Sequence, residues 1–170
     1  FIVDSMLDVV NENFGEGTDT IRASLTYSIA GMPFIENLVL TGTANIDATG
    51  NIFNNTLTGN AGVNTLTGGL GNDTYIMNSN DVAIENPGEG TDTLIVTITS
   101  GTFVVPANFE NIILVGTGSV SLTCDATSNT FTGNNGNNTL DGGGGADLLS
   151  GGLGNDVYIV DDAGDVVVEN

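Results

Sequence analysis

The chain has 170 residues, and its 21 acidic residues against one basic residue, Arg22, give a formal net charge of −20. This charge excludes nucleic acid as a partner and disfavours anionic membranes. Because there is no histidine, Ser–His and Cys–His nucleophile systems are excluded. The single cysteine, Cys124, cannot form an internal disulfide and is interpreted as a small buried hydrophobe. The apolar runs are too short for membrane insertion.

A long repeat divides the chain. GEGTDT occurs at Gly15–Thr20 and again at Gly88–Thr93, and IENLVLTG at Ile35–Gly42 recurs as FENIILVG at Phe109–Gly116. Self-similarity at a fixed spacing is the signature of repeat architectures. The prediction is a single repeat domain over 1–170, with long repeats at about 1–74 and 75–157 and a partial third repeat at 158–170.

The chain begins and ends at the same phase of this repeat, because Phe1–Asn13 resembles Tyr158–Asn170. Neither end carries a polar cap, which solenoid ends normally need. We therefore expect either a piece cut from a longer array or ends that stack head to tail into an open filament.

The first nine-residue unit is Phe14–Arg22. It has glycine at positions two and four, Asp19 at position six and an apolar residue at position eight. A glycine-rich segment can turn with positive φ, and three residues with a central apolar one form a short strand with one inward side chain. Two turns and two strands then close one coil in about 18 residues.

The same unit recurs in two nonapeptide blocks, 50–76 and 133–168. Helical periodicity is absent, so we predict an all-β parallel β-roll or β-solenoid with little or no helix. Looser units occur at Pro87–Ile95 and Val160–Val168. The predicted inward side chains are Leu57, Leu66, Tyr75, Phe131, Leu140, Leu149, Tyr158 and Val167.

The stretches 23–48 and 95–122 have lost the glycines and alternate apolar with polar residues. They are predicted either as longer strands of the same solenoid, with turns that bind no metal, or as a small packed sheet.

Three units match GGxGxDxUx at every constrained position: Gly68–Ile76, Gly142–Ser150 and Gly151–Ile159. They resemble the RTX family of secreted bacterial proteins, the haemolysin-type calcium-binding repeat. This resemblance implies calcium between stacked loops, an extracellular or cell-surface location and export by a type I channel.

The turns suit calcium, which takes six to eight oxygen ligands. Glycine-rich turns offer carbonyls, position six offers a carboxylate, and the second half of each cage must come from the turn one coil away. Asp–Asp pairs should make the best sites, whereas an Asn brings no charge and should make a weaker or empty one. The pairs at this spacing are Asp73 with Asp92, Asp147 with Asp165, Asn138 with Asp156, and Asn64 with Asp81.

Several of these residues also have a purely structural interpretation. Asn55, Asn64, Asn129 and Asn138 can instead satisfy local turn amides. Glu36 and Glu110 are either capping groups or surface residues. Zinc and iron are poorly supported by an oxygen-rich ligand set. The predicted Ca²⁺-binding residues are Gly69, Gly71, Asp73, Gly88, Gly90, Asp92, Gly143, Gly145, Asp147, Gly152, Gly154, Asp156, Asp165, Asn138, Asp81 and Asp19.

The predicted function is a structural module of an adhesin, surface layer or extracellular filament, which folds when calcium binds outside the cell. The alternative is the C-terminal folding and secretion module of a secreted hydrolase or epimerase. No catalytic residue is predicted, because a solenoid lyase needs basic groups and only Arg22 is available.

Overall fold

The computed structural model describes residues 1–169, and every regular element among them is a β-strand. Neighbouring strands pair in parallel with a register of one coil; Thr56 pairs with Thr74 and Leu57 with Tyr75. The predicted all-β solenoid of about 18 residues per turn is thereby confirmed. The described residues include no helix long and apolar enough to cross a bilayer.

The chain forms two compact units, Phe1–Gly90 and a second that begins at Thr91, and each is described by itself. The predicted long-repeat boundaries stay a prediction, and Asn170, at the end of the predicted third repeat, lies outside the described residues.

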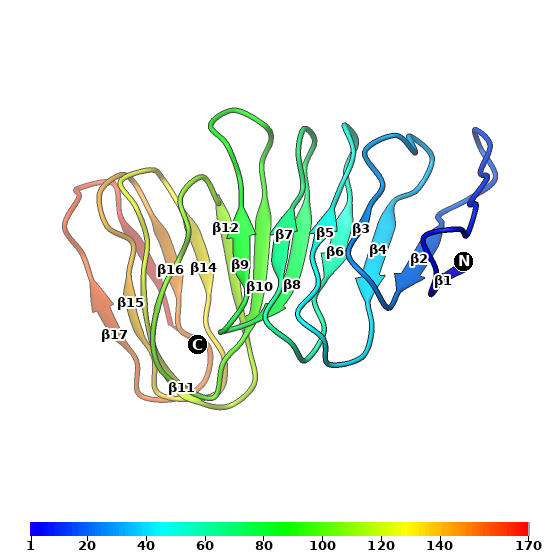
Figure 1. Cartoon of the computed structure of the whole chain (residues 1–170). Helices are drawn as coiled ribbons and strands as arrows, with labels where there is room; N and C mark the ends of the chain where they lie inside the picture. Colours follow the sequence, from blue (N-terminus) through cyan, green and yellow to red (C-terminus); the bar gives the residue numbers. More distant parts are fainter. Residues whose placement is uncertain (170) are drawn as a thin grey trace. The chain divides into compact units, whose positions relative to one another are not determined.

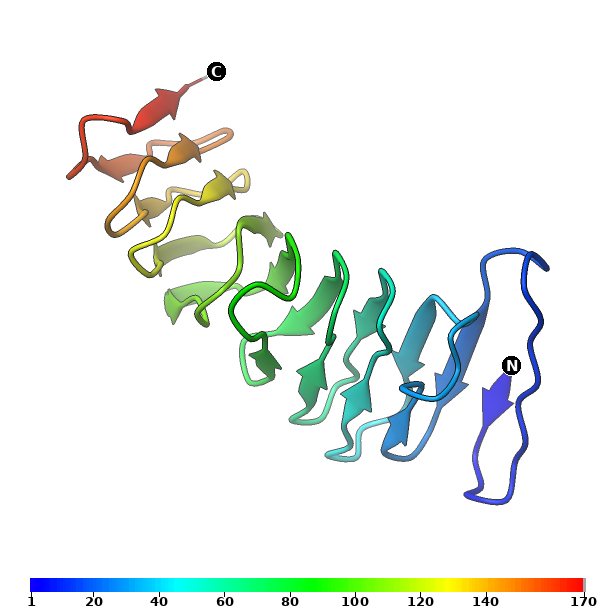
Figure 2. The same cartoon turned by 90° about the horizontal axis from the view of Figure 1, so that it is seen from above.

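The first unit places its strands in two parallel sheets, and successive coils stack beside one another (Figures 1 and 2). The order in one sheet is β1 (Ile2–Val3), β2 (Thr20–Ala23), β4 (Asn37–Leu40), β6 (Thr56–Thr58) and β8 (Thr74–Asn78). The order in the other is β3 (Tyr27–Ser28), β5 (Ala48–Thr49), β7 (Thr65–Thr67) and β9 (Val82–Ile84).

The second unit repeats this arrangement. One sheet contains β10 (Thr93–Thr97), β12 (Asn111–Val115), β14 (Thr130–Thr132), β16 (Leu148–Ser150) and β18 (Val166–Val168), in that order. The other contains β11 (Ser100–Val104), β13 (Ser119–Thr123), β15 (Thr139–Asp141) and β17 (Val157–Ile159).

The stretches without glycine continue the solenoid. Within 23–48, strands β3 and β4 pair in register with the coils that follow. In the stretch 95–122, strands β11, β12 and β13 are five residues long, as is β8 of one strict unit, whereas β16 and β17 of the other strict units have three. Both stretches therefore belong to the same solenoid, and a separate packed sheet is not formed. The expectation of longer strands holds for 95–122, whereas in 23–48 β3 has two residues and β4 has four.

The core of each unit is a thin row of apolar side chains between its two sheets. Most of the predicted inward residues are fully buried; Leu57, Leu66, Leu140 and Leu149 are examples. Val167 differs, at 41% exposed, because β18 is an edge strand in the described sheet. Cys124 is half-buried rather than buried, and burial raises its pKa to about 12, as expected of an inert thiol.

Two inward tyrosines carry a hydrogen-bond network instead of a purely apolar contact. The hydroxyl of Tyr75 accepts the N–H of Gly68 at 2.5 Å and donates to the carboxylate of Glu85. Tyr158 repeats the arrangement with the N–H of Gly151 at 2.9 Å and with Glu169. Each tyrosine thus ties the first glycine of its own turn to a glutamate ten or eleven residues after the tyrosine.

We expect Tyr75→Phe to lower the free energy of unfolding by about 1–3 kcal/mol, because it removes a buried acceptor from Gly68 and a buried donor from Glu85. Tyr158→Phe is the matched control, since Tyr158 is only half-buried and water can replace its hydroxyl. Thermal unfolding at saturating calcium measures both. Equal losses in the two variants would contradict the role of burial.

Candidate metal centre

The strict turns owe their path to two glycines each. The glycines at positions two and four have positive φ, a region that other residues rarely adopt. This confirms the turn conformation expected from the sequence, and it turns the backbone so that the coils can stack closely. The φ values are 97° for Gly69, 119° for Gly71, 76° for Gly143, 102° for Gly145, 93° for Gly152 and 130° for Gly154.

The first glycine of each strict turn has a different role, which the sequence did not reveal. A Cβ on Gly142 would lie 2.0 Å from Oδ2 of Asp147, and one on Gly151 would lie 2.2 Å from Oδ2 of Asp156. The position-six carboxylate therefore folds back over the first residue of its own turn. Only glycine leaves room for it there.

Position-six side chains form columns that run from coil to coil. Oδ1 of Asp165 accepts the backbone N–H of Asp147 at 3.0 Å, and Oδ1 of Asp147 accepts that of Asn129 at 2.7 Å. In each case the partner lies 18 residues earlier in the chain. This ladder sets one position-six residue directly beside the next, at the spacing predicted for shared metal sites.

The other predicted pairs fall as follows. Asn138 donates its backbone N–H to Oδ1 of Asp156 at 2.7 Å. The backbone N–H of Asn64 donates to Oδ1 of Asp81 at 2.9 Å. Within the first unit, Oδ1 of Asp73 accepts the backbone N–H of Asn55 at 2.6 Å. Asp92 belongs to the second unit, so the predicted pairing of Asp73 with Asp92 stays a prediction.

Two glutamates also belong to these columns. Oε2 of Glu36 accepts the N–H of Asp19 at 2.8 Å, and Oε2 of Glu110 accepts that of Asp92 at 2.7 Å. They are capping groups, which decides between the two interpretations left open by the sequence. The available signal was their spacing of 17 and 18 residues from Asp19 and Asp92.

The second carboxylate oxygen of the position-six aspartates occurs in two different environments. In the strict turns of the second unit, Oδ2 of Asp147 and Oδ2 of Asp156 are buried and have no hydrogen-bond partner. In the looser turn Val160–Val168, local amides occupy this oxygen: the backbone N–H groups of Asp161 and Asp162 donate to Oδ2 of Asp165. In the looser turn of Asp19, Oδ2 is buried without a partner, as in the strict turns. A buried carboxylate oxygen without a donor is costly unless a cation neutralises it.

At three turns with Asn at position six, Asn55, Asn64 and Asn138, the turn's own backbone occupies the side-chain oxygen. At the fourth, Oδ1 of Asn129 is buried without a hydrogen-bond partner. Oδ1 of Asn138 accepts the N–H of Asn134 at 3.1 Å, and Oδ1 of Asn55 accepts that of Asn51 at 2.7 Å. These amides satisfy their own turns and bring no charge. The second oxygen of Asp81 is also occupied within its own turn, because Oδ2 accepts the N–H of Asn78 at 2.9 Å.

The pKa values of two stacked aspartates move in opposite directions. Burial raises the pKa of Asp147, and the nearby carboxylates of Asp165, Asp161 and Asp162 add to this, while the N–H of Asn129 lowers it. The N–H groups of Asp147, Asp162 and Asp161 lower the pKa of Asp165. Asp147 is therefore the aspartate of this column that lacks compensation in the absence of a cation.

Backbone carbonyl oxygens also lie close to the strict turns. A Cβ on Gly143 would lie 2.0 Å from the carbonyl oxygen of Asp125, and one on Gly152 would lie 2.4 Å from that of Asn134. The position-two glycines thus rest against backbone oxygens of the preceding coil. Carboxylates together with carbonyls form the donor chemistry that Ca²⁺ prefers.

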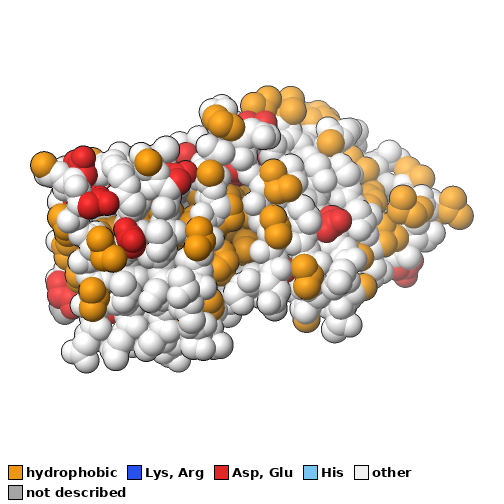
Figure 3. Space-filling view, turned by 60° about the vertical axis from the view of Figure 1, so that its left-hand side comes forward, with side chains coloured by type: hydrophobic (Ala, Val, Ile, Leu, Met, Phe, Trp, Pro, Cys, Tyr) orange, Lys and Arg blue, Asp and Glu red, His pale blue; other side chains and the backbone are white. Residues whose placement is uncertain are grey.

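The surface of the protein is also acidic. Acidic side chains lie among exposed hydrophobic ones on the face shown in Figure 3, and no lysine or arginine is visible there. With a net charge of −20, the folded chain repels itself unless cations bind.

Comparison with known proteins gives one match. The family model of the RTX calcium-binding nonapeptide repeat matches four copies, over residues 48–76 and 125–158. No curated protein and no solved structure matches the chain.

Proposed function

We propose that the chain is a structural module held together by Ca²⁺ at its stacked turns, because residues 48–76 and 125–158 match the model of the RTX calcium-binding nonapeptide repeat. The observation that carries the proposal is Oδ2 of Asp147, a buried oxygen without a donor in a residue that is 2% exposed. Ca²⁺ supplies the missing positive charge and accepts both carboxylate and carbonyl ligands.

The strict turns are the proposed primary sites. Asp147 and Asp156 offer carboxylate oxygens, and the turn glycines bring the backbone carbonyls into reach. Asp165 and Asp81 already use both oxygens for backbone amides, so they support a neighbouring site less strongly. Because the repeat places Asp19, Asp73 and Asp92 at the same position of their turns, we propose that their carboxylates are calcium ligands as well.

Calcium binding is proposed to drive folding. The ion-free chain carries 21 acidic residues against one basic one, so compaction is opposed by repulsion, and ligand binding free energy becomes folding free energy. Weak sites of this class fill at about millimolar calcium, as in extracellular modules. We therefore propose that the chain is secreted through a bacterial type I channel and folds outside the cell.

The proposed biological role is a segment of an adhesin, surface layer or filament, in which coils add length and the solenoid ends associate head to tail. RTX repeats are typically non-catalytic, and the absence of histidine removes the commonest general base. A structural role, rather than chemistry on a substrate, suits this residue set best.

The test is circular dichroism of the purified chain at neutral pH in chelator, in calcium and in magnesium. We expect a β-sheet spectrum in calcium and an expanded-chain spectrum in chelator. Magnesium should not restore the β-sheet spectrum, because it demands a smaller octahedral shell and gives up its waters reluctantly. Equal β-content in chelator and in calcium would refute the proposal.

A further inference from the structure

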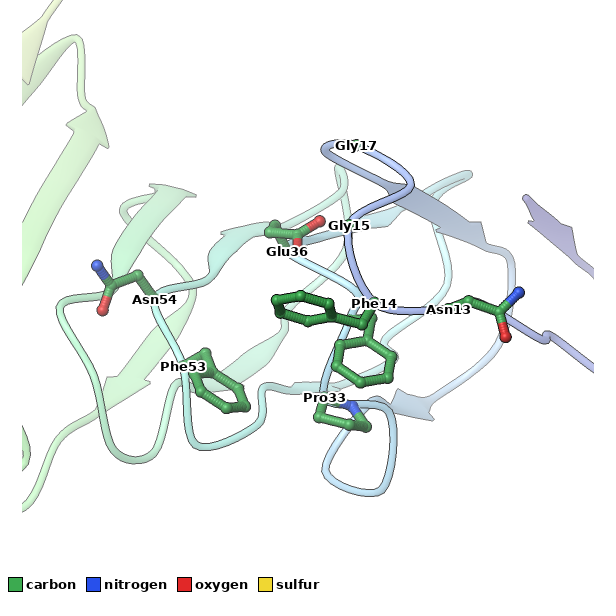
Figure 4. A pocket seen from close by; sticks show the side chains of 9 residues that line it. Asn13, Phe14, Gly15, Gly17, Pro33, Glu36, Phe53 and Asn54 are labelled. Carbon is green, nitrogen blue, oxygen red and sulfur yellow. The ribbon is translucent and has the colours of Figure 1, made fainter.

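The first unit contains a cavity of about 480 Å³, outside the columns of position-six residues. Phe14, Phe34, Phe53 and Pro33 line it, and Glu36 contributes a carboxylate. In Figure 4, Phe14 and Phe53 face the same open space, with Glu36 and Pro33 on opposite sides of it. Its volume lies within the range of small-molecule sites.

The rings are exposed although they are large and apolar. Phe14 is 86% exposed and Phe53 is 51% exposed. Phe14 packs edge-to-face on Phe34, with ring centroids 5.8 Å apart and an interplanar angle of 68°. Leaving such surface in water forgoes the free energy that burial would bring, so these rings contribute little to the solenoid core.

The second long repeat shows that the fold does not require these phenylalanines. It keeps the glutamate, Glu110 in place of Glu36, together with the same hydrogen bond to the aspartate one coil earlier. The aromatic residues are lost: Phe14, Phe34 and Phe53 correspond to Pro87, Asn108 and Thr127. The aromatic cavity is thus an addition to one copy of a repeated scaffold.

The surroundings of the cavity are negative. A smaller adjoining cavity of about 190 Å³ shares Pro33 and Phe34 and is lined by Glu12. Desolvation, a hydrogen bond to Glu16 and the charge of Asp19 raise the pKa of Glu12, against one backbone hydrogen bond that lowers it. Glu36 therefore lines the cavity of the three rings, and Glu12 lines the adjoining cavity, with Glu16 and Asp19 near it.

We propose that this cavity binds a small organic cation with an alkylated ammonium group. Aromatic faces attract cations through their quadrupole, and such contacts are the recognised means of holding quaternary ammonium groups. The methyl groups of the ligand cover the rings of Phe14 and Phe53, and its charge is balanced by Glu36. The inference does not depend on the proposed calcium sites beyond needing the folded chain.

Other ligand classes fit less well. A hard metal ion needs six or more oxygens, whereas this wall includes three phenylalanine rings and Pro33 and a single carboxylate, Glu36. An anion would meet Glu36 and a chain of net charge −20. A neutral apolar ligand would gain from the rings but nothing from the carboxylates.

The experiment titrates the calcium-loaded chain with choline and follows the NMR signals of the phenylalanine rings. The neutral comparison is the carbon isostere of choline, in which a quaternary carbon replaces the nitrogen. We expect saturable binding of choline and at least about tenfold weaker binding of the isostere. Phe14→Leu and Phe53→Leu should each weaken choline binding about fivefold without unfolding the chain, because both rings are exposed.

The charge is tested with a matched pair. Glu36→Gln keeps an acceptor for the N–H of Asp19 but removes the carboxylate, and should weaken choline binding several-fold. Glu110→Gln makes the same change where the rings are absent, and should leave binding unchanged. Equal affinity for choline and its isostere overturns the proposal, as does the absence of saturable binding to a chain whose circular dichroism shows it folded in calcium.

Discussion

Asp147→Asn is expected to lower the calcium affinity of its turn at least about tenfold and yet to stabilise the ion-free fold. The carboxylate supplies charge to the cation, and the amide does not. Without the cation, the buried Oδ2 has no donor and faces the negative charge of Asp165, Asp161 and Asp162. The neutral side chain removes that repulsion.

The sign of the ion-free effect follows from the pKa. The pKa of Asp147 is raised in the fold above its unfolded value. The stability associated with the protonated group is therefore fully present below the unfolded pKa and is lost as pH rises through the folded pKa. At neutral pH the ion-free wild type bears this loss, and Asp147→Asn does not.

Asp165→Asn is the matched control in the same column, one coil away. Three backbone N–H groups lower the pKa of Asp165 in the fold. The charged carboxylate therefore stabilises the fold at pH values above its unfolded pKa, and this stabilisation is lost as pH falls through the folded pKa. Its replacement should weaken the ion-free fold, opposite to Asp147→Asn, while also lowering calcium affinity.

Calorimetric calcium titration measures the affinities. Refolding in chelator with trimethylamine N-oxide, which favours compact states, ranks the ion-free stabilities. If both substitutions changed the ion-free stability in the same direction, the different environments assigned to Asp147 and Asp165 would be contradicted.

The fold could be predicted from the sequence because each position of the nine-residue repeat has the same local conformation in every strict unit. Glycines at positions two and four predicted positive φ, and the apolar residue at position eight predicted the core row. Leu57 and Leu149 are buried accordingly. The stacking of Asp147 with Asp165 also followed from spacing alone.

The environment of each carboxylate oxygen could not be read in the same way. Asp147 and Asp165 have the same residue type and the same phase, but only Asp165 has local amides at Oδ2. That difference depends on the backbone path of each turn, which side-chain identity does not encode. The cavity was accessible in principle, because Phe14, Phe34 and Phe53 recur at roughly one coil.

Gly142→Ala is expected to destabilise the calcium-loaded fold by about 2–3 kcal/mol, a large effect for one methyl group. The new Cβ would lie 2.0 Å from Oδ2 and 2.4 Å from Cγ of Asp147. That side chain has little freedom to move, because it is buried and its Oδ1 accepts the N–H of Asn129. Moving it would also displace the proposed calcium ligand, so calcium affinity should fall together with stability.

Gly144→Ala is the control in the same turn. The nearest atom to its added Cβ is Cβ of Ala126 at 3.4 Å, an ordinary contact, and its φ is not positive. We expect a change within about 0.5 kcal/mol, measured by thermal unfolding in calcium.

A double-mutant cycle identifies the obstacle. If the carboxylate of Asp147 is what excludes a methyl group at position one, Gly142→Ala should cost clearly less in an Asp147→Ala background, where Oδ2 and Cγ are gone. Additive losses would mean that backbone conformation, rather than the folded-back carboxylate, requires glycine. Position one of the nonapeptide is thus predicted to be glycine because the carboxylate at position six occupies the space of its side chain.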